Sequence, residues 1–559
     1  MKRAFGVNPD FVVEYISAGI TRHSTSRENS DYSLEYEVSD GAIKCSIIPK
    51  TAISLVKVSV IGRFDFKAGD VFFGNGYQSW TTTSEYNRND KMLDITPMAA
   101  ISPLRNLAGI SSDCRFVDAP KTAGVFISHC YTYVRNGEEV TLIGSLTEKQ
   151  GFTVFTGNMA GNFISVSKDV EGVTIKDKYE LFDLFITEGT YDEVFDAYFS
   201  AMKVSKPAVD HLSGYTSWYN YFQKIDENII LRDLDALDRV RDSVSIFQVD
   251  DGYETFVGDW EDPNPEKFPH GMGYIAQKIH EKGYKAGIWL APFSVQIKSR
   301  TYKEHPDWII RKKGKPVLGC PGWGGAYTLD IYNEGARNYI KQFFDTVLNK
   351  WGYDLVKLDF LYSQCLWPRN GKSRGTIMCE AMDFLRECCG DKLILGCGVP
   401  LGAAFGRVDA CRISCDVDLA YTGKFYNALN VNNEIPSAQN AIRNSIFRRH
   451  LNGRVFCNDP DVFFLRYSNL KFNMEQKKVL AFINHIFGDV LFVSDCANEY
   501  TANDVELCKK AFAPSDGVKV ISAGYESADN ILIKYSLDGA EKQLRFNLKT
   551  GVGNIDECF

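Results

Sequence analysis

Residues 355–361 read Leu-Val-Lys-Leu-Asp-Phe-Leu, an apolar run interrupted by two charges of opposite sign. Because strand side chains alternate between two faces, Lys357 and Asp359 are predicted to point one way while their apolar neighbours, Phe360 included, point the other. A lysine and a carboxylate that face inward are costly to bury unless they are paired or used. The stretch therefore predicts a buried strand whose polar face holds either a structural ion pair or part of a site.

Seven further apolar segments resemble this one, and stretches of helix length such as 333–349 and 376–387 lie between them. The eight predicted strands are Gly214–Trp218, Ser245–Asp250, Lys285–Leu290, Leu355–Phe360, Leu393–Gly396, Cys411–Cys415, Arg454–Cys457 and Val490–Val493. Alternation of strands and helices is typical of βαβ units, and eight such units predict a (β/α)8 TIM barrel.

Both flanks of this region have a different pattern. From about residue 11 to 186, short alternating segments broken by turn residues predict an antiparallel β-sandwich. A helix at Tyr191–Met202, followed by Lys206-Pro207, looks like a linker, and short strands are expected again after about Cys496. We therefore predict a multidomain α/β protein with an N-terminal sandwich and linker helix (1–205), a barrel (206–495) and a small C-terminal β domain (496–559).

Composition excludes several classes of protein. The chain has 559 residues, 45% of them hydrophobic and 24% charged, as in ordinary globular proteins. A net charge of -8 provides no basic surface for nucleic acid and no polybasic membrane anchor. Neither a secretory h-region nor a run long enough to cross a bilayer is present, so we expect no membrane association.

The cysteines and histidines predict neither disulfides nor a metal site. There are 15 Cys, an odd number without a C-x-x-C pair, and the 8 His are scattered. We expect a cytoplasmic protein with no metal and no other cofactor.

Polar and aromatic residues stand where the predicted strands end. In a (β/α)8 barrel the active site lies at the carboxyl ends of the strands. The residues at those ends are Trp218, Asp250, Asp251, Trp289, Asp359, Cys397 and Asp416.

The pair Asp250-Asp251 precedes Gly252, and the tripeptide has two interpretations. Asp and Gly both favour turns, so it can be a turn and nothing more. At the end of a barrel strand, two adjacent carboxylates can instead accept hydrogen bonds from neighbouring sugar hydroxyls, and charged acceptors make the stronger bonds.

Asp416 also has two interpretations. Arg412 and Asp416 share a parity within 411–418, so they can form an ion pair that fixes the mouth of the barrel. Alternatively Asp416 is the partner carboxylate of Asp359, which retaining glycoside hydrolysis requires at about 5 Å. In that case Lys357 is expected to keep the pKa of Asp359 low, and an apolar surround would help Asp416 to hold a proton. Asp409 and Asp418 are the rival acids.

Two loops are candidates for substrate contact. Residues 72–80 form an aromatic, glycine-bearing loop in the sandwich region, and its Trp80 belongs either to the sheet core or to the site of the neighbouring domain. The long connection after the third barrel strand contains Gly319-Cys320-Pro321-Gly322-Trp323-Gly324-Gly325, which is typical of a binding loop.

Together these motifs resemble glycoside hydrolase family 36, a family of α-galactosidases. They follow the order of the family through the barrel, and Tyr77-Gln78-Ser79-Trp80 resembles the sandwich loop of its members. The motifs are 214–219, 247–254, 287–293, 305–308, 356–360, 394–398, 412–416 and 458–461.

The resemblance implies a role for each site residue. Asp359 would be the nucleophile and Asp416 the general acid and base. Asp250 and Asp251 would bind O4 and O6 of the sugar, and Lys357 would lie near O3 and O4. Cys397 and Arg412 would lie beside C2. The pocket walls would be formed by Trp80, Trp218 and Trp289, with Tyr219 as further pocket lining.

The chain departs from the long members of the family at two motifs. These members carry Lys-Trp-Asp at the nucleophile and Cys-Ser-Gly-Gly-Gly after strand five, whereas this chain has Lys357-Leu358-Asp359 and Gly396-Cys397-Gly398-Val399-Pro400. It is similar to the shorter branch of the family.

The implied function is that of a retaining exo-α-galactosidase, a hydrolase of carbohydrate metabolism that acts on terminal α-linked galactose. The alternatives are an α-N-acetylgalactosaminidase or an α-galactosyl transglycosylase on the same site. A catalytically silent carbohydrate-binding barrel is a third, but it would be expected to lose one of the two carboxylates.

Overall fold

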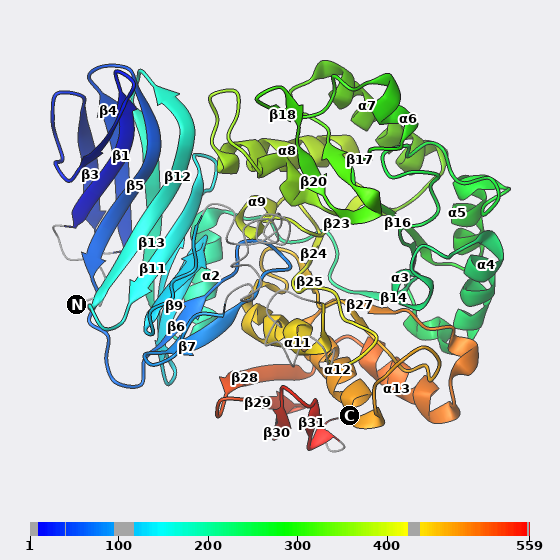
Figure 1. Cartoon of the computed structure of the whole chain (residues 1–559). Coiled ribbons are helices and arrows are strands. Elements are labelled where there is room, and N and C mark those ends of the chain that lie inside the picture. Colours follow the sequence, from blue (N-terminus) through cyan, green and yellow to red (C-terminus); the bar gives the residue numbers. More distant parts are fainter. Residues whose placement is uncertain (1–8, 40, 94–116, 423–435, 556–557, 559) are drawn as a thin grey trace.

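A computed structural model describes residues 9–39, 41–93, 117–422, 436–555 and 558. It shows an antiparallel β-sandwich beside a barrel of parallel strands and helices, with a small antiparallel sheet below the barrel (Figure 1). The predicted fold class is confirmed. The limits of the three domains stay predictions.

The sandwich consists of two antiparallel sheets. One sheet has the order β2 (Ile20–Ser24), β1 (Asp10–Ser17), β5 (Ile53–Arg63), β12 (Phe163–Ile175), β11 (Phe152–Asn158) and β8 (Val125–His129). The other has the order β3 (Tyr32–Ser39), β4 (Ala42–Pro49), β13 (Tyr179–Gly189), β10 (Glu139–Ser145), β9 (Tyr131–Asn136), β6 (Val71–Gly74) and β7 (Ser84–Asn87). Alternate side chains such as Phe11, Val13 and Tyr15 are buried in the core, as the period of two predicted.

The barrel sheet keeps its strands in chain order, and all neighbours are parallel. The strands are β14 (Leu212–Thr216), β15 (Ile246–Val249), β16 (Lys285–Leu290), β22 (Leu355–Leu358), β23 (Leu393–Gly396), β24 (Ala410–Arg412), β25 (Cys457–Asp459), β26 (Val462–Phe463) and β27 (Val490–Val493). The seventh strand is thus divided: β25 pairs with β24, and β26 pairs with β27.

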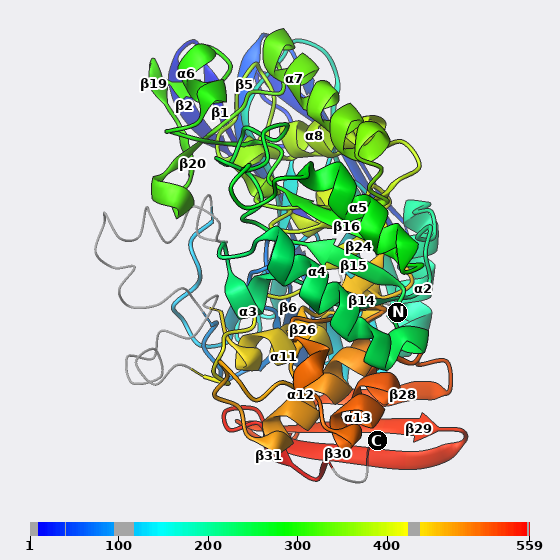
Figure 2. The same ribbon diagram turned by 90° about the vertical axis from the view of Figure 1, so that its right-hand side faces the viewer.

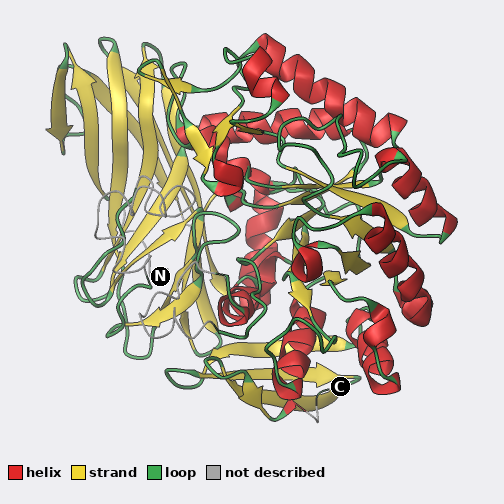
Figure 3. Cartoon of the chain, turned by 45° about the vertical axis from the view of Figure 1, so that its right-hand side comes forward, coloured by secondary structure: helices red, strands yellow, loops and turns green. Residues whose placement is uncertain are grey.

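Helices surround these strands (Figure 3). The principal ones are α4 (Glu227–Ala236), α5 (Gly271–Glu281), α7 (Glu334–Asp345), α8 (Arg374–Cys389), α11 (Ala438–Phe447), α12 (Met474–Phe487) and α13 (Ala502–Phe512). Caps predictable from sequence begin several of them. For example, Asn333 accepts a hydrogen bond from the amide of Ala336 at the start of α7, and Ser373 accepts one from Thr376 at the start of α8. The linker helix is found as α2 (Tyr191–Met202). Among the described helices, none is long and apolar enough for a membrane span.

Four predicted strands are wrong at their ends. The sixth strand, predicted at Cys411–Cys415, spans Ala410–Arg412. The fourth strand ends at Leu358 rather than Phe360, because Phe360 has a left-handed φ of 55° and turns the chain. The first strand ends at Thr216, and Trp218 begins the short helix α3 (Trp218–Tyr221). Arg454 lies in a turn before the seventh strand, and its guanidinium pairs with two acidic side chains of α2.

The C-terminal region differs from the expectation at its start. α13 follows the last barrel strand, so short strands return only at β28 (Val518–Tyr525). The sheet continues with β29 (Asn530–Leu537), β30 (Ala540–Asn547) and β31 (Val552–Gly553) and lies against the barrel helices α11 and α12 (Figure 2). Tyr525 contacts α11, because its hydroxyl accepts a hydrogen bond from Arg443 at 3.2 Å and its ring packs on Phe447. The small sheet thus supports the helix that faces the sandwich.

Candidate active site

A cavity of about 450 Å3 opens at the carboxyl ends of the barrel strands. This size is in the range of small-molecule sites. Of the side chains predicted from the sequence, those that line the cavity are Trp80, Trp218, Asp250, Asp251, Trp289, Lys357, Asp359 and Asp416. They come from distant segments of the barrel and from the sandwich loop.

Asp359 lies directly after β22, where its carboxylate is held from two sides. Oδ2 accepts a hydrogen bond from Trp289 Nε1 at 3.1 Å, and Oδ1 accepts one from the backbone N–H of Phe360 at 2.8 Å. Asp359 is 8% exposed. The left-handed turn at Phe360 also brings this ring to the cavity wall, so the expectation that Phe360 faces away from Asp359 is wrong.

Lys357 makes its ion pair with Asp250 rather than with Asp359. Its Nζ lies 2.8 Å from Asp250 Oδ2, and both side chains are buried. Burial disfavours the charged lysine, but the attraction of Asp250 outweighs it and raises the pKa of Lys357.

The pKa of Asp359 also differs from the expectation. Burial raises the pKa of Asp359 above its ordinary value, and the opposing effects of Lys357 and the Trp289 hydrogen bond do not cancel this. The sequence-based expectation of a low pKa is therefore wrong, because desolvation is the larger effect. A carboxylate of this kind is weakly solvated, which favours nucleophilic attack once it is ionised.

Asp250 and Asp251 end β15 and face the same cavity. Besides Lys357, Asp250 Oδ2 accepts hydrogen bonds from Gln248 Nε2 at 2.8 Å and from the Thr216 hydroxyl at 3.3 Å. Asp251 Oδ2 accepts from Trp323 Nε1 at 2.9 Å and from Gln223 Nε2 at 3.0 Å. Both carboxylates are thus fixed in orientation.

Several cavity residues were missed by sequence reasoning. They are Gln223, Gly322, Trp323, Phe360, Cys415 and Pro436. Trp323 belongs to the loop identified as a binding loop, although no residue in it was singled out. The rings of Trp323 and Trp80 each pack on Phe360, with centroids 5.0 and 5.2 Å apart. The mouth of the cavity is therefore aromatic on two sides.

Asp416 lies in the loop after β24, and its side chain is 42% exposed. Its Oδ1 accepts a hydrogen bond from Arg412 Nη1 at 2.8 Å, so the ion pair considered from the sequence is present. The apolar surround expected for Asp416 is therefore not what the structure shows. Asp359 and Asp416 nevertheless both face the cavity, from strands that are two apart in the sheet.

The two rival acids have other roles. Asp409 precedes β24 at the opposite end of the barrel, where it accepts hydrogen bonds from Arg386 at 2.7 Å and from the N–H of Ile394 at 2.8 Å. Asp418 Oδ1 accepts a bond from the backbone N–H of Leu419 at 2.7 Å. Neither side chain lines the cavity.

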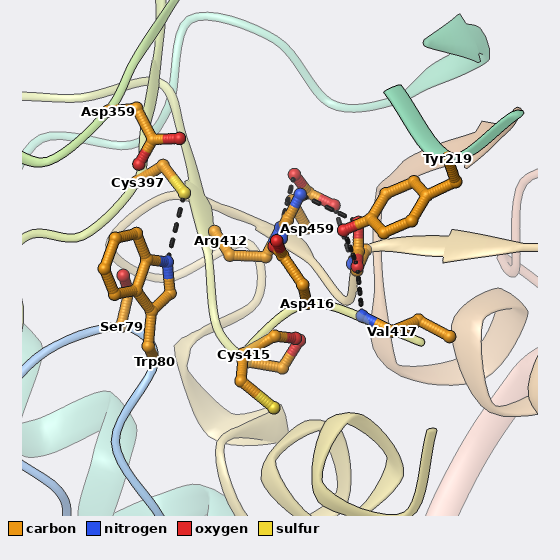
Figure 4. A network of polar contacts seen from close by, with 12 residues as sticks. Ser79, Trp80, Tyr219, Asp359, Cys397, Arg412, Cys415, Asp416, Val417 and Asp459 are labelled. Carbon is orange, nitrogen blue, oxygen red and sulfur yellow. Dashed lines mark hydrogen bonds and ion pairs between the residues drawn. The ribbon is translucent and has the colours of Figure 1, made fainter. Parts of the chain in front are cut away.

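The side chains that line the cavity do not include Tyr219, Cys397 or Arg412. Figure 4 shows Cys397 near Asp359 and Trp80, and Arg412 near Asp416. Cys397 is next to Asp359, and its sulfur accepts a hydrogen bond from Trp80 Nε1 at 3.2 Å. Arg412 is 2% exposed and supports Asp416 from below. Tyr219 is 2% exposed and donates its hydroxyl proton to Asp461.

Trp80 reaches the barrel from the loop between β6 and β7. Arg448, at the end of α11 and fully buried, donates to the carbonyl oxygens of Ser79 at 2.6 Å and Gln78 at 3.1 Å. The Ser79 N–H in turn donates to the Val399 carbonyl at 3.0 Å. Gly398 has a φ of 57° and lies so near the indole that a Cβ there would be 2.9 Å from Trp80 Cζ2. Only glycine satisfies both conditions.

Within residues 9–39, 41–93, 117–422 and 436–555, no three His, Cys, Asp or Glu side chains are grouped as metal ligands would be.

Comparison with known proteins agrees with this geometry. Residues 219–366 match the family model described as Melibiase. Alpha-galactosidase 1 of Pediococcus pentosaceus is 30% identical over 138 residues, which are 22% of this chain and 18% of that protein. An "A type blood alpha-D-galactosamine galactosaminidase" of Flavonifractor plautii is 32% identical over 199 residues, or 31% of this chain and 18% of that protein. The matched segments thus span less than a fifth of these curated relatives.

A solved structure is similar over a much larger part. It is TtGalA, an alpha-galactosidase from Thermus thermophilus in complex with p-nitrophenyl alpha-D-galactopyranoside. The TM-score is 0.72 at 25% identity, and the match covers 91% of this chain and 96% of that one.

The structure thus has carboxylates in a tryptophan-lined cavity of a (β/α)8 barrel, with an N-terminal sandwich that supplies one wall. Such an arrangement suits glycoside chemistry. The chain is similar to α-galactosidases: the Melibiase model matches part of the barrel, and TtGalA is similar over 91% of this chain.

Proposed function

We propose that the protein is a retaining exo-α-galactosidase that removes terminal α-linked galactose from oligosaccharides or glycoconjugates. The observation that carries the proposal is the placement of Asp359 and Asp416 on one cavity, at the ends of β22 and the loop after β24. Similarity to α-galactosidases supports the galactose specificity, since one that resembles the chain over most of its length binds an aryl α-galactoside.

In this mechanism Asp359 attacks the anomeric carbon while Asp416 protonates the departing glycosidic oxygen. A β-linked galactosyl-enzyme results. Asp416, now a carboxylate, then takes a proton from water, which attacks the same carbon and releases galactose with its original α configuration. Two inversions give overall retention, and the Asp359 carboxylate is regenerated.

Substrate orientation is assigned to the charged residues at the base of the cavity. Asp250 and Asp251 are proposed to accept hydrogen bonds from O4 and O6, with Lys357 near O3 and O4. The two carboxylates need little rearrangement to bind hydroxyl groups, because their orientation is set before the sugar arrives. Trp80, Trp218 and Trp289 would contact the apolar faces of the ring.

A screen of terminal α- and β-glycosides, followed by NMR of the first-formed sugar, tests the proposal. We expect turnover of α-galactosides such as melibiose or raffinose, with α-galactose appearing before mutarotation. Release of β-galactose first would rule out the double displacement, and activity confined to another glycoside would rule out the substrate.

A second candidate substrate is a terminal α-linked N-acetylgalactosamine. It is favoured by the likeness to the galactosaminidase of Flavonifractor plautii. The resemblance places Cys397 and Arg412 beside C2, but neither side chain lines the cavity, so neither excludes an acetamido group there. Comparison of the two p-nitrophenyl α-glycosides decides between them. Transfer to a sugar acceptor would use the same carboxylates and is tested by adding acceptor and measuring the transfer product.

Replacing Lys357 with methionine is expected to move the acidic limb of the pH profile of kcat/KM upward by about one unit or more. The sign follows from the opposed effects on Asp359: burial raises its pKa and Lys357 lowers it, so loss of the lysine leaves burial less opposed. Asp359 would then be ionised only at higher pH, and activity at acidic pH falls first.

Lys477→Met is the matched control for this variant. Lys477 is also a buried barrel lysine, but its Nζ bonds the carbonyl oxygens of Leu465 and Arg466 away from the cavity. We expect its acidic limb to stay in place. An unmoved limb in Lys357→Met would show that Lys357 does not act on the nucleophile.

A further inference from the structure

The segment Asn458-Asp459-Pro460-Asp461 has no part in the mechanism above, yet it lies beside the general acid. It ends β25 and turns the chain toward β26. Asp459 and Asp461 are both fully buried. Asp461 has a φ of 80°, a conformation that costs an aspartate free energy, and its N–H donates to Asp459 Oδ1 at 2.8 Å. The barrel thus holds two buried carboxylates here at some cost.

Both carboxylates face the arginine that supports Asp416. Arg412 Nη2 lies 2.8 Å from Asp461 Oδ1, Nε lies 3.3 Å from Asp459 Oδ2, and Nη1 lies 2.8 Å from Asp416 Oδ1. One guanidinium therefore serves three carboxylates. Each of the three guanidinium nitrogens faces a different carboxylate. The positive charge of Arg412 is therefore shared among Asp416, Asp459 and Asp461.

Asp461 also holds the backbone next to Asp416 by a hydrogen bond. Its Oδ2 accepts a hydrogen bond from the N–H of Val417, the residue after Asp416, at 2.7 Å. The hydroxyl of Tyr219 donates to the same oxygen. Asp461 therefore fixes the peptide that carries Asp416 as well as the cation that pairs with it.

The charges of this cluster favour a retained proton. The charged and titratable groups that face Asp461 are Arg412, Asp416, Asp459 and Tyr219. Burial raises the pKa of Asp461, the two neighbouring carboxylates raise it further, and Arg412 only partly opposes them. Three buried or half-buried carboxylates with a single cation are expected to hold a proton among them.

We propose that Asp461 is a positioning residue for the general acid: it competes with Asp416 for Arg412 and thereby lets Asp416 carry the proton that it must donate. While Asp416 is protonated, the guanidinium stays paired with Asp459 and Asp461. When Asp416 has given its proton to the leaving oxygen, it takes up the bond from Nη1 as a carboxylate. Arg412 stays charged throughout, and Asp461 forms no bond to the substrate. The inference rests on the proposed roles of Asp359 and Asp416.

The test is Asp461→Asn in the full-length chain. An amide cannot balance Arg412, so the guanidinium is left to Asp416 and Asp459 and holds Asp416 as a carboxylate. We expect the alkaline limb of kcat/KM to move down by about one pH unit. Hydrolysis of raffinose, which needs protonation of its leaving group, is expected to fall at least ~10-fold more than that of an aryl α-galactoside with an activated leaving group. Equal losses on both substrates with an unmoved limb would leave Asp461 a purely structural residue and overturn the proposal.

Asp495→Asn provides a matched control. Asp495 is likewise fully buried in the barrel, pairs with a buried arginine, Arg466, at 2.8 Å, and accepts bonds from backbone N–H groups and from the Tyr500 hydroxyl. It has no contact with Asp416. We expect this variant to lose stability without a shift of the limb. An equal shift in both variants would contradict a specific role of Asp461.

A measurement of thermal stability gives a readout independent of activity. Burial and the neighbouring carboxylates raise the pKa of Asp461, so the cluster of Asp416, Asp459 and Asp461 keeps one shared proton in the folded state that the unfolded chain releases. The contribution of this proton to stability is complete at acidic pH and is lost as pH rises above the ordinary carboxyl range. We expect Tm of the wild type to decline more steeply with rising pH than Tm of Asp461→Asn. Parallel declines would contradict the shared proton.

Two further comparisons complete the test. Asp461→Glu keeps the charge and is expected to keep the alkaline limb near that of the wild type; a limb displaced as far as in Asp461→Asn would count against competition for charge. If Asp461→Asn does not fold, Asp459→Asn takes its place, because it removes another competitor for Arg412. It should move the alkaline limb in the same direction, and an unmoved limb would refute the proposal. A wild type without turnover of any α-galactoside refutes the proposed function itself, whereas an active wild type with unmoved limbs in the variants refutes only the role of Asp461.

Discussion

Asp359→Ala is expected to abolish turnover of α-galactosides, lowering kcat by about 10^4-fold or more. The variant lacks the atom that attacks the anomeric carbon, and no other described carboxylate replaces it, because Asp250 is already paired with Lys357. KM is expected to change much less, since the sugar-binding residues stay in place. Single-turnover and steady-state rates with an aryl α-galactoside measure the effect.

Rescue by azide makes this prediction specific. The anion can enter the space that the carboxylate vacates and attack from the same face, so an activated aryl α-galactoside should give β-galactosyl azide. Asp354→Ala is the matched control: Asp354 directly precedes the same strand but lies at the opposite end of the barrel, paired with His280 at 2.8 Å. It is expected to retain turnover. Full activity in Asp359→Ala would refute the assignment of the nucleophile.

Asp416→Asn is expected to separate substrates by their leaving groups. For raffinose, whose leaving oxygen needs a proton, kcat/KM should fall by about 10^3-fold, whereas for an activated aryl α-galactoside the glycosylation step should fall by only about 10-fold. Turnover of the aryl substrate is then limited by release of the galactosyl-enzyme, because no base activates water. A burst of phenolate followed by a slow steady state would reveal this.

Asp418→Asn serves as the control for Asp416. Asp418 is two residues away and caps the backbone of its own loop, with Oδ1 2.7 Å from the Leu419 nitrogen. It is expected to leave the dependence on leaving group unchanged. Equal losses on both substrates in Asp416→Asn would assign the acid role elsewhere.

The alternation of apolar strand segments with helix-length segments, and their spacing in the sequence, predict the fold well. Buried parallel strands are nearly continuous apolar runs, so β16, β23 and β27 are found at the predicted residues. The carboxyl end of each strand then places Asp250, Asp359 and Asp416 on one side of the barrel without any knowledge of side-chain contacts.

Prediction from the sequence fails where local backbone geometry sets the direction of a side chain or where desolvation sets a pKa. A left-handed residue cannot be foreseen at a phenylalanine, so the turn of Phe360 into the cavity was missed. Period-two reasoning paired Lys357 with Asp359 on its own strand, whereas the nearer carboxylate is Asp250, on a strand far away in the chain. Trp323 was missed because a glycine-rich loop has no periodicity that says which side chain it directs inward.

The insertion of the sandwich loop into the barrel also bears on how the chain becomes active. Trp80 is synthesised early, but the arginine that fixes its loop, Arg448, is made more than three hundred residues later. Contacts of such long sequence separation form late in folding. The loop that carries Trp80 therefore lacks its contacts with Arg448 until the barrel is made, and a nascent chain has no complete pocket until α11 is in place. For the same reason, the two regions are expected to lose the pocket together on unfolding rather than one after the other.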